Sequence, residues 1–216
     1  WRMADWKGAV ASKGEIRNQK MRAVLLVASR MFNLAGYHGT SLDDIAEEVG
    51  VTKAALYYYF KNKEQLLYDC MQMSYDCGHQ ARTESQEAGG TAIDRLVILY
   101  RRFAELLMSE RGAYTSKANL HALPEDLRNE LMGRRRQLDR YSRGLLQAAI
   151  DEGSIRPVDV RIASNYYLGA INWILRWYGD EEKRSPSEIA ETFVDLMLNG
   201  VMLHANPPAD QDQDQK

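Results

Sequence analysis

Hydrophobic positions recur at helical spacing along most of the chain. Near the N-terminus, Val24, Ala28, Met31, Phe32 and Ala35 follow steps of three and four residues, which place them on one face of an α-helix. No segment shows the strict alternation of a half-buried strand. The pattern therefore predicts an all-α fold. Helices are expected at residues 15–35, 41–49, 52–60, 62–87, 91–109, 111–121, 124–152, 159–178 and 185–203.

Start and stop residues support several of these helix boundaries. Gly36 and Gly50 supply C-terminal stops for two helices, because glycine readily adopts the left-handed conformation found there. Ser41 and Asp44 form a pair like a capping box at the start of the second helix. Pro124 stands where a first-turn proline belongs, ahead of two acidic residues that favour a helix N-terminus. These signals predict short helices joined by tight turns in the N-terminal part of the chain.

Two of the short helices are joined by a tight turn at residues 49–52. This is a helix-turn-helix arrangement, in which the second helix enters the major groove of DNA. On that helix Leu56 and Phe60 face the preceding helices, whereas Lys53 and Tyr57 lie on another face. Lysine can donate to guanine or phosphate, alanine can contact a thymine methyl group and a tyrosine hydroxyl can bind phosphate. The surface predicted to face DNA is completed by Ala54, Ala55, Tyr58 and Tyr59.

Four linked motifs resemble those of the tetracycline-repressor (TetR) family, and the resemblance covers residues 15–67. The motifs are TSLDDIA at residues 40–46, GVTK at 50–53, LYYYF at 56–60 and KEQLL at 63–67. One departure is Tyr59, because the family often has histidine at that position. The resemblance implies a homodimer that acts as a repressor on two-fold symmetric, double-stranded operator DNA. It also implies that a small-molecule effector in the C-terminal domain releases the DNA.

The resemblance assigns roles to individual positions. A lysine in the first turn of a helix is electrostatically unfavourable unless an anion lies there, which favours a phosphate contact for Lys63 over a merely solvated side chain. Core packing is the alternative for the tyrosines, above all for Tyr58. Phosphate contacts are implied for Thr40, Tyr57, Tyr59 and Lys63. Positions nearest the bases are implied for Thr52, Lys53, Ala54 and Ala55.

The implied domain organisation places DNA binding at one end of the chain. A flexible N-terminal arm over residues 1–14 precedes a three-helix helix-turn-helix domain over residues 15–61. A long helix then leads into a larger helical ligand-binding and dimerisation domain over residues 62–205. Residues 206–216 combine two prolines with alternating Asp and Gln, cannot build a core and are expected to be disordered.

The last two helices are expected to form the homodimer interface. A four-helix interface of this kind is self-complementary and suits a two-fold operator. Small residues, among them Gly169, Ala170 and Gly200, permit close approach of the helices. Ordinary packing within one chain is the alternative for part of these positions. The apolar residues that suggest the interface are Ile189, Phe193 and Leu196 on the final helix and Ala163, Tyr166, Tyr167, Ile174 and Trp177 on the preceding one.

An aromatic and basic cluster at residues 172–178 resembles the same helix in TetR-family members that respond to acyl-CoA thioesters. Trp173 and Trp177 offer apolar walls for an acyl chain, and Arg176 together with Arg136, or its neighbours at 134 and 135, offers donors for CoA phosphates. The resemblance thus implies an acyl-CoA effector. The alternatives are a packing cluster with cation–π contacts at the dimer interface and, for the arginines, a solvated helix face.

Composition and charge narrow the classes of protein. Hydrophobic residues make up 45% and charged residues 27% of the 216 residues, as is usual for soluble globular proteins. Residues 1–63 carry ten Lys/Arg and six Asp/Glu, whereas the rest of the chain carries 18 and 24. The basic end is therefore the one expected to meet phosphate.

No catalytic or metal-binding motif is present. The sequence lacks a Gly-rich phosphate loop, a Gly-x-Ser-x-Gly elbow and metal-ligand spacing among its four histidines, so neither an enzyme nor a cofactor or metal is expected. Cys70 and Cys77 lie ~10 Å apart along one helix at a rise of ~1.5 Å per residue, which is too far for a disulfide. A helical enzyme, or an interaction protein without sequence-specific DNA binding, is the alternative function.

The hydrophobic runs also bear on location. None approaches the ~18–20 residues that span a bilayer, and residues 1–11 lack the compact apolar core of a signal peptide. A cytoplasmic protein without membrane association is therefore expected.

Overall fold

The computed structural model describes residues 12–109, 117–179 and 181–200 and confirms the all-α fold. The described residues contain no strand. None of the helices described is long and apolar enough to cross a membrane. The elements are α1 (Lys13–Ala35), α2 (Leu42–Val49), α3 (Lys53–Tyr59), α4 (Lys63–Glu87), α5 (Ala92–Ser109), the 3₁₀-helix η2 (Lys117–Ala122), α6 (Glu125–Asp151), α7 (Val160–Trp177) and α8 (Pro186–Asn199).

Two predicted helix ends move by a few residues for reasons of capping. Helix α1 begins at Lys13 because the Ser12 hydroxyl accepts the Glu15 amide at 3.1 Å and the Glu15 carboxylate accepts the Ser12 amide at 2.6 Å. Ser12 thus caps α1, and residues 13 and 14 belong to this helix rather than to the predicted arm, of which residues 1–11 lie outside the described part. Helix α8 ends at Asn199, where Gly200 has a φ of 66°. The predicted extension to residue 203 and the tail at 206–216 also lie outside the described residues.

The prediction of an α-helix at residues 111–121 is wrong for the part of this segment that the structure describes. Residues 117–122 form the 3₁₀-helix η2, and residues 110–116 lie outside the described part. The tighter helix fits a short segment that ends beside Pro124, because a proline disfavours the α conformation of the residue before it. Leu120 and Leu123 anchor η2 in a hydrophobic core that it shares with α1–α3.

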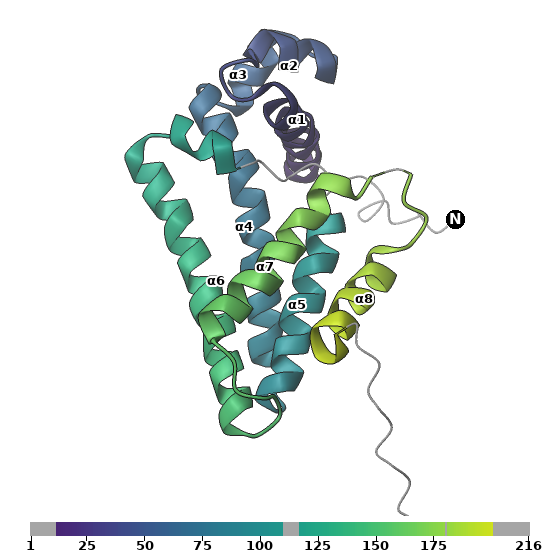
Figure 1. Cartoon of the computed structure of the whole chain (residues 1–216). Helices are drawn as coiled ribbons and strands as arrows, with labels where there is room; N and C mark the ends of the chain where they lie inside the picture. The colour runs from purple at the N-terminus through teal and green to yellow at the C-terminus, as the bar shows by residue number, and fades with distance from the viewer. Residues whose placement is uncertain (1–11, 110–116, 180, 201–216) are drawn as a thin grey trace, which may run out of the picture.

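Helix α4 belongs to both hydrophobic cores of the molecule. Its first turns, including Leu66, Cys70 and Met71, pack with α1–α3, whereas Cys77 and Ala81 pack with α5–α8. Both cysteines are buried and free. Figure 1 shows α4 running from the small bundle of α1–α3 into the larger bundle of α5–α8. We call the first bundle the head and the second the body. The boundary predicted at residue 61 therefore falls just before a helix that is common to both.

Candidate functional site

The turn between α2 and α3 is fixed by local hydrogen bonds. The Ser41 hydroxyl accepts the Asp44 amide at 3.0 Å, and the Asp44 carboxylate accepts the Ser41 amide at 2.8 Å. Gly50 ends α2 in the left-handed conformation, with φ 77° and ψ 35°, which glycine adopts without steric cost. The Thr52 hydroxyl then accepts the Ala55 amide at 3.2 Å and starts α3. These caps set the angle between α2 and α3 within the head.

Helix α3 presents the predicted surface to solvent. Leu56 and Phe60 are buried against the other head helices, whereas the side chains of Tyr57 and Tyr58 are 49% and 72% exposed. Core packing is therefore not the role of Tyr58 in the head. Tyr59 is half-buried and packs against the core. The other members of the surface are exposed Thr52, Lys53 and Ala54 and half-buried Ala55.

Two charged residues that the sequence interpretation did not assign lie beside this surface. The Lys53 ammonium is 2.7 Å from the Asp43 carboxylate of α2. That hydrogen bond and the negative charge of Asp43 raise the pKa of Lys53. The guanidinium carbon of Arg17 on α1 lies 5.9 Å from the ring centroid of Tyr58. Asp43 stands within the TSLDDIA motif, but only the packing of α2 against α3 shows that it reaches Lys53.

Thr40 lies in the core rather than on the surface, contrary to the implied phosphate contact. Its side chain is only 2% exposed, and its hydroxyl donates to the backbone carbonyls of Gly36 at 2.9 Å and Met31 at 3.3 Å. The single hydroxyl proton is thus already used to tie the α1–α2 connection to the end of α1. The Thr40 side chain has a structural role in this arrangement.

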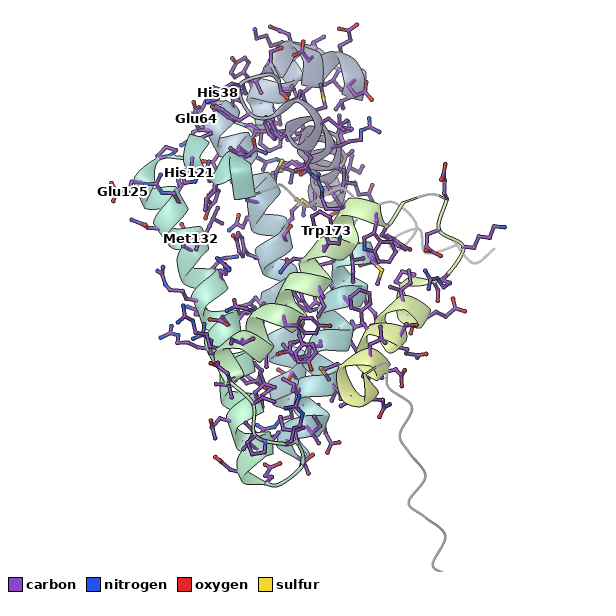
Figure 2. All side chains as sticks on the ribbon, viewed as in Figure 1. His38, Glu64, His121, Glu125, Met132 and Trp173 are labelled. Carbon is purple, nitrogen blue, oxygen red and sulfur yellow. The ribbon has the colours of Figure 1, made fainter. Side chains whose placement is uncertain are left out.

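Lys63 lies beside Tyr37, a residue that is hydrogen-bonded to η2. Its ammonium is 4.1 Å from the ring centroid of Tyr37, and burial lowers its pKa while the Glu64 and Asp44 charges oppose that shift. The Tyr37 hydroxyl donates to Glu64 at 2.8 Å, and the Tyr37 amide donates to the Asn119 side chain at 2.8 Å. Figure 2 shows Glu64 on the head side of the molecule. The ammonium of Lys63, for which a phosphate contact is predicted, is therefore held over the aromatic ring of Tyr37.

Asn119 joins η2 to the segment around the end of α1. It is buried, accepts the Tyr37 amide and donates to the Phe32 carbonyl at 3.1 Å. Phe32 lies in the last turn of α1 and Tyr37 just after it, 87 and 82 residues earlier in the chain. No local sequence signal marks this residue, because its two hydrogen bonds depend on how η2 docks on the head.

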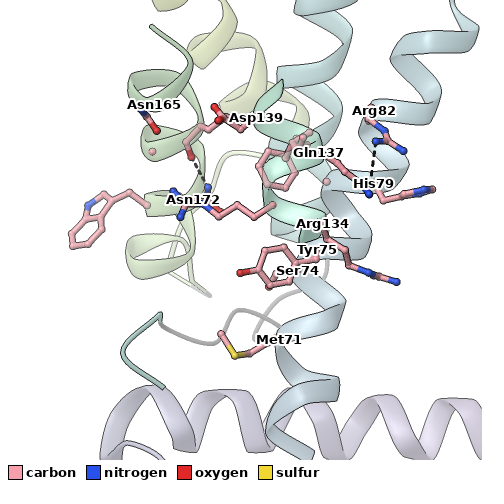
Figure 3. Close-up of a pocket in the computed structure, with 17 residues that line it drawn as sticks. Met71, Ser74, Tyr75, His79, Arg82, Arg134, Gln137, Asp139, Asn165 and Asn172 are labelled. Carbon is pink, nitrogen blue, oxygen red and sulfur yellow. Dashed lines mark hydrogen bonds between the residues drawn. The ribbon is translucent and has the colours of Figure 1, made fainter. Parts of the chain in front are cut away.

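A pocket of about 420 Å³ lies in the body between α4, α6 and α7, within the ~300–1,000 Å³ typical of ligand sites. Figure 3 shows Arg82 and His79 on the α4 side and Asn165 and Asn172 on the α7 side. Its apolar walls come from four helices and include Met71, Tyr75, Phe103, Leu138 and Leu168. The site thus combines an apolar lining with polar and charged groups.

Only one of the four predicted ligand residues lines this pocket. Trp173 does so, and Figure 2 shows it near the end of α7 that faces the head. Arg136 does not, because residues on a helix advance by about 100° each and the pocket face of α6 is formed by Arg134, Arg135, Leu138 and their neighbours. The predicted arginine is thus replaced by the two before it.

The other two predicted ligand residues lie outside the pocket lining. Arg176 lies one turn beyond Asn172, with its guanidinium carbon 5.7 Å from the Trp173 ring centroid. Trp177 is exposed and contacts Tyr178, with the ring centroids 6.4 Å apart. The Trp–Arg–Trp cluster is therefore mostly a surface feature of α7 that meets the pocket only at Trp173.

Exposed apolar side chains form a stripe along α7. Ile162, Tyr166, Trp173 and Trp177 follow helical spacing and are between 42% and 70% exposed. Leu196 and Leu198 on α8 are also about half exposed. In contrast, Ile174 and Ile189, which the sequence suggested for the dimer interface, are buried within the body core. Exposed apolar side chains on one face of a helix are typical of an interaction site.

Comparison with known proteins agrees with a helix-turn-helix head and a separate helical body. Residues 24–70 match the family model of bacterial regulatory proteins of the tetR family, and residues 89–201 match the model of the tetracyclin repressor-like C-terminal domain. The fatty acid metabolism regulator protein of Bacillus subtilis (strain 168) is 26% identical over 173 residues, which cover 77% of this chain and 87% of that protein.

Solved structures resemble the chain over most of its length. A TetR-family transcriptional regulator from Bordetella parapertussis 12822 is 30% identical, with a TM-score of 0.71 over 88% of this chain and 98% of that one. AibR, solved in complex with isovaleryl coenzyme A and operator DNA, is 27% identical, with a TM-score of 0.67 over 83% of this chain and 98% of that one. These relatives are regulators, so the enzyme alternative is wrong. The helix-turn-helix head, the helical body and the two family matches together identify the chain as a member of the TetR family of transcriptional regulators.

Proposed function

We propose that this chain is a dimeric repressor whose operator complex is released by an acyl-CoA thioester bound in the pocket of the body. The observation that carries this proposal is the course of α4. Met71 is buried in the core of the head and also lines the pocket, and five further pocket residues follow it on the same helix. A ligand that displaces α4 therefore acts directly on the packing of the head.

DNA is bound by α3 and by the first turn of α4. Lys53 and Ala54 are exposed near the start of α3, where the second helix of this motif reads base edges. The hydroxyl of Tyr57 and the ammonium of Lys63 then hold phosphates on either side. Since the Lys63 pKa is lowered by burial, a phosphate that approaches this lysine stabilises its charged form.

The second copy of the chain packs on the exposed stripe of α7 and on α8. An isologous interface buries the same patch on both subunits, so the exposed rings of Tyr166, Trp173 and Trp177 pack against the same stripe of the second copy. The two recognition helices of such a dimer must lie ~34–36 Å apart, or a small multiple of this distance, to enter successive major grooves.

The ligand chemistry follows from the pocket. Its volume of about 420 Å³ accommodates an acyl chain but not a whole coenzyme A thioester, so the nucleotide part lies towards the surface. Arg135 is exposed there, and Arg134 is paired with Asp76 at 2.5 Å. The solved complex of AibR with isovaleryl coenzyme A and the fatty-acid regulator among the relatives support this ligand class.

A titration tests the proposal. Operator DNA is first selected from a random duplex library, and the labelled complex is titrated with acyl-CoA esters of increasing chain length while fluorescence anisotropy is recorded. Operator affinity should fall about 5- to 150-fold at saturation, the usual range of coupling between two sites. Free CoA and the free fatty acids are the controls. Lack of release by every chain length would overturn the acyl-CoA proposal.

A further inference from the structure

We propose that Arg82 is the anion-binding residue of the pocket, and that the effector carries an acidic group, carboxylate or phosphate, which Arg82 holds beside an apolar chain. The inference deepens the proposed function and rests on it for the location of the effector. It concerns a residue of α4, the helix that runs into the head. The predicted arginines at positions 136 and 176 do not take this role.

The guanidinium of Arg82 is poorly satisfied by the protein. Its Nε is buried, and within the described residues no acceptor lies within hydrogen-bond distance of that atom. Its Nη1 reaches only the side-chain oxygen of Gln137, at 3.4 Å. None of the carboxylates described in the structure forms an ion pair with it. A ligand anion therefore meets the guanidinium at its Nη groups, whose contact with Gln137 is open to solvent, and supplies the charge-assisted hydrogen bonds that the protein does not.

Apart from Arg135, which is exposed to solvent, the charged side chains that neighbour Arg82 in the pocket are already compensated. Asp139 is the only carboxylate among the described pocket residues. One of its oxygens accepts from Arg143 Nε at 3.0 Å and from the Ser164 hydroxyl at 2.9 Å, and the other pairs with Arg143 Nη2. Arg134 is paired with Asp76. Glu84, which follows Arg82 closely on α4, pairs with Arg102 of α5. The pocket therefore holds a cation whose natural partners are engaged elsewhere.

The geometry favours an anion with an apolar body. A guanidinium binds carboxylate and phosphate oxygens through its planar fork of donors. The lining on either side of Arg82 includes Phe103, Leu138 and Leu168, which bury hydrocarbon. Two sources supply such an anion: a carboxylate on the acyl part of the effector, or a phosphate of its coenzyme. A neutral ligand of the same shape would leave the charge of Arg82 unpaired in the pocket.

Binding of simple probes tests the inference without DNA. Dissociation constants are measured by calorimetry for octanoate, octyl phosphate, octanoyl-CoA and the neutral octanamide. The wild type should bind at least one anionic probe roughly 10- to 100-fold more tightly than octanamide, and Arg82→Gln should abolish that preference. Dependence on Arg82 for octanoate indicates a carboxylate as the partner, and dependence only for octyl phosphate or octanoyl-CoA indicates a phosphate.

Arg95 provides a matched control. It is half-buried on α5, its Nε is also buried without an acceptor among the described residues, and it does not line the pocket. Arg95→Gln should therefore leave the anion preference unchanged. Arg82→Lys keeps the charge and should keep part of the preference, which shows that a loss in Arg82→Gln is not a loss of folding.

The outcomes separate this inference from the proposed function. Equal binding of octanoate, octyl phosphate, octanoyl-CoA and octanamide, no binding of any probe, or an Arg82→Gln variant with the wild-type preference would each overturn the role of Arg82. Octanoyl-CoA that binds in an Arg82-dependent way without weakening the operator complex would uphold that role and contradict the release mechanism.

Discussion

The head and the pocket differ in the partners that they provide for positively charged side chains. On the head, Lys53 is exposed and paired with Asp43 at 2.7 Å, and Lys63 lies 4.1 Å from the ring centroid of Tyr37. In the pocket, Arg82 has a buried Nε and reaches only a neutral amide oxygen at 3.4 Å. The lysines that we propose to face DNA thus have substitute partners in the free protein, whereas Arg82 forms no ion pair among the described residues.

This difference has a physical consequence for binding. An exposed ion pair contributes little to stability. In the DNA complex that we propose, Lys53 therefore exchanges Asp43 for DNA at a small cost, which suits a surface that must release DNA again. Arg82 is half-buried and forms no ion pair among the described residues, so the pocket gains most from a ligand that supplies the missing negative charge. The head is thus built for reversible contacts and the pocket for a specific one.

The largest expected effect in the head is on base discrimination. Lys53→Ala should reduce the preference for the correct base pair at one operator position roughly 5- to 150-fold, as for a lost contact to a base edge. Binding to random DNA should change much less. The measurement is a competition assay with operator duplexes that carry every single base-pair change. Equal weakening on all duplexes would assign Lys53 to phosphate.

A smaller and more uniform effect is expected at Lys63. Lys63→Ala should weaken binding to operator and random DNA alike, roughly fivefold at ~0.15 M salt, and should lower the slope of log affinity against log salt by about one. Affinities measured from ~0.05 to ~0.3 M salt give this slope. The exposed Lys20 of α1 provides a matched Lys→Ala control. A strong difference between operator and random DNA would contradict the phosphate contact.

The smallest effect is expected where the compensating charge is removed. Asp43→Asn frees Lys53 and should raise affinity for random DNA about two- to fivefold, in keeping with the modest strength of exposed ion pairs. Operator affinity should rise less, so specificity falls. Glu47→Gln, which neutralises an exposed carboxylate on the same helix, measures the general effect of charge. If the two variants behaved alike, Asp43 would have no specific hold on Lys53.

The head could be predicted closely from the sequence because its signals are local. Ser41, Gly50 and Thr52 each act on residues within one turn, so the caps and the short helices can be recognised along the chain. The role of Thr40 was not predictable in this way. Its hydroxyl reaches the Met31 carbonyl nine residues earlier, a contact that depends on how the α1–α2 connection folds back on α1.

The pocket could be predicted only in outline, because its residues come together through tertiary packing. Arg82 and Gln137 are 55 positions apart, and no periodicity relates them. The arginines of α6 show the limit: the sequence indicated that one of three faces a ligand, but the rotation of α6 decides which. That rotation turns Arg134 and Arg135, and not Arg136, towards the pocket.

The coupling between pocket and head through α4 is tested most directly by a reciprocal binding measurement. The dissociation constant of octanoyl-CoA is determined by calorimetry for the free protein and for the protein saturated with operator DNA. Operator affinity is determined in turn with and without saturating octanoyl-CoA. Coupling requires that each ligand weaken the other by the same factor, expected at about 5- to 150-fold. Equal octanoyl-CoA affinity with and without operator would contradict a pocket that controls DNA binding.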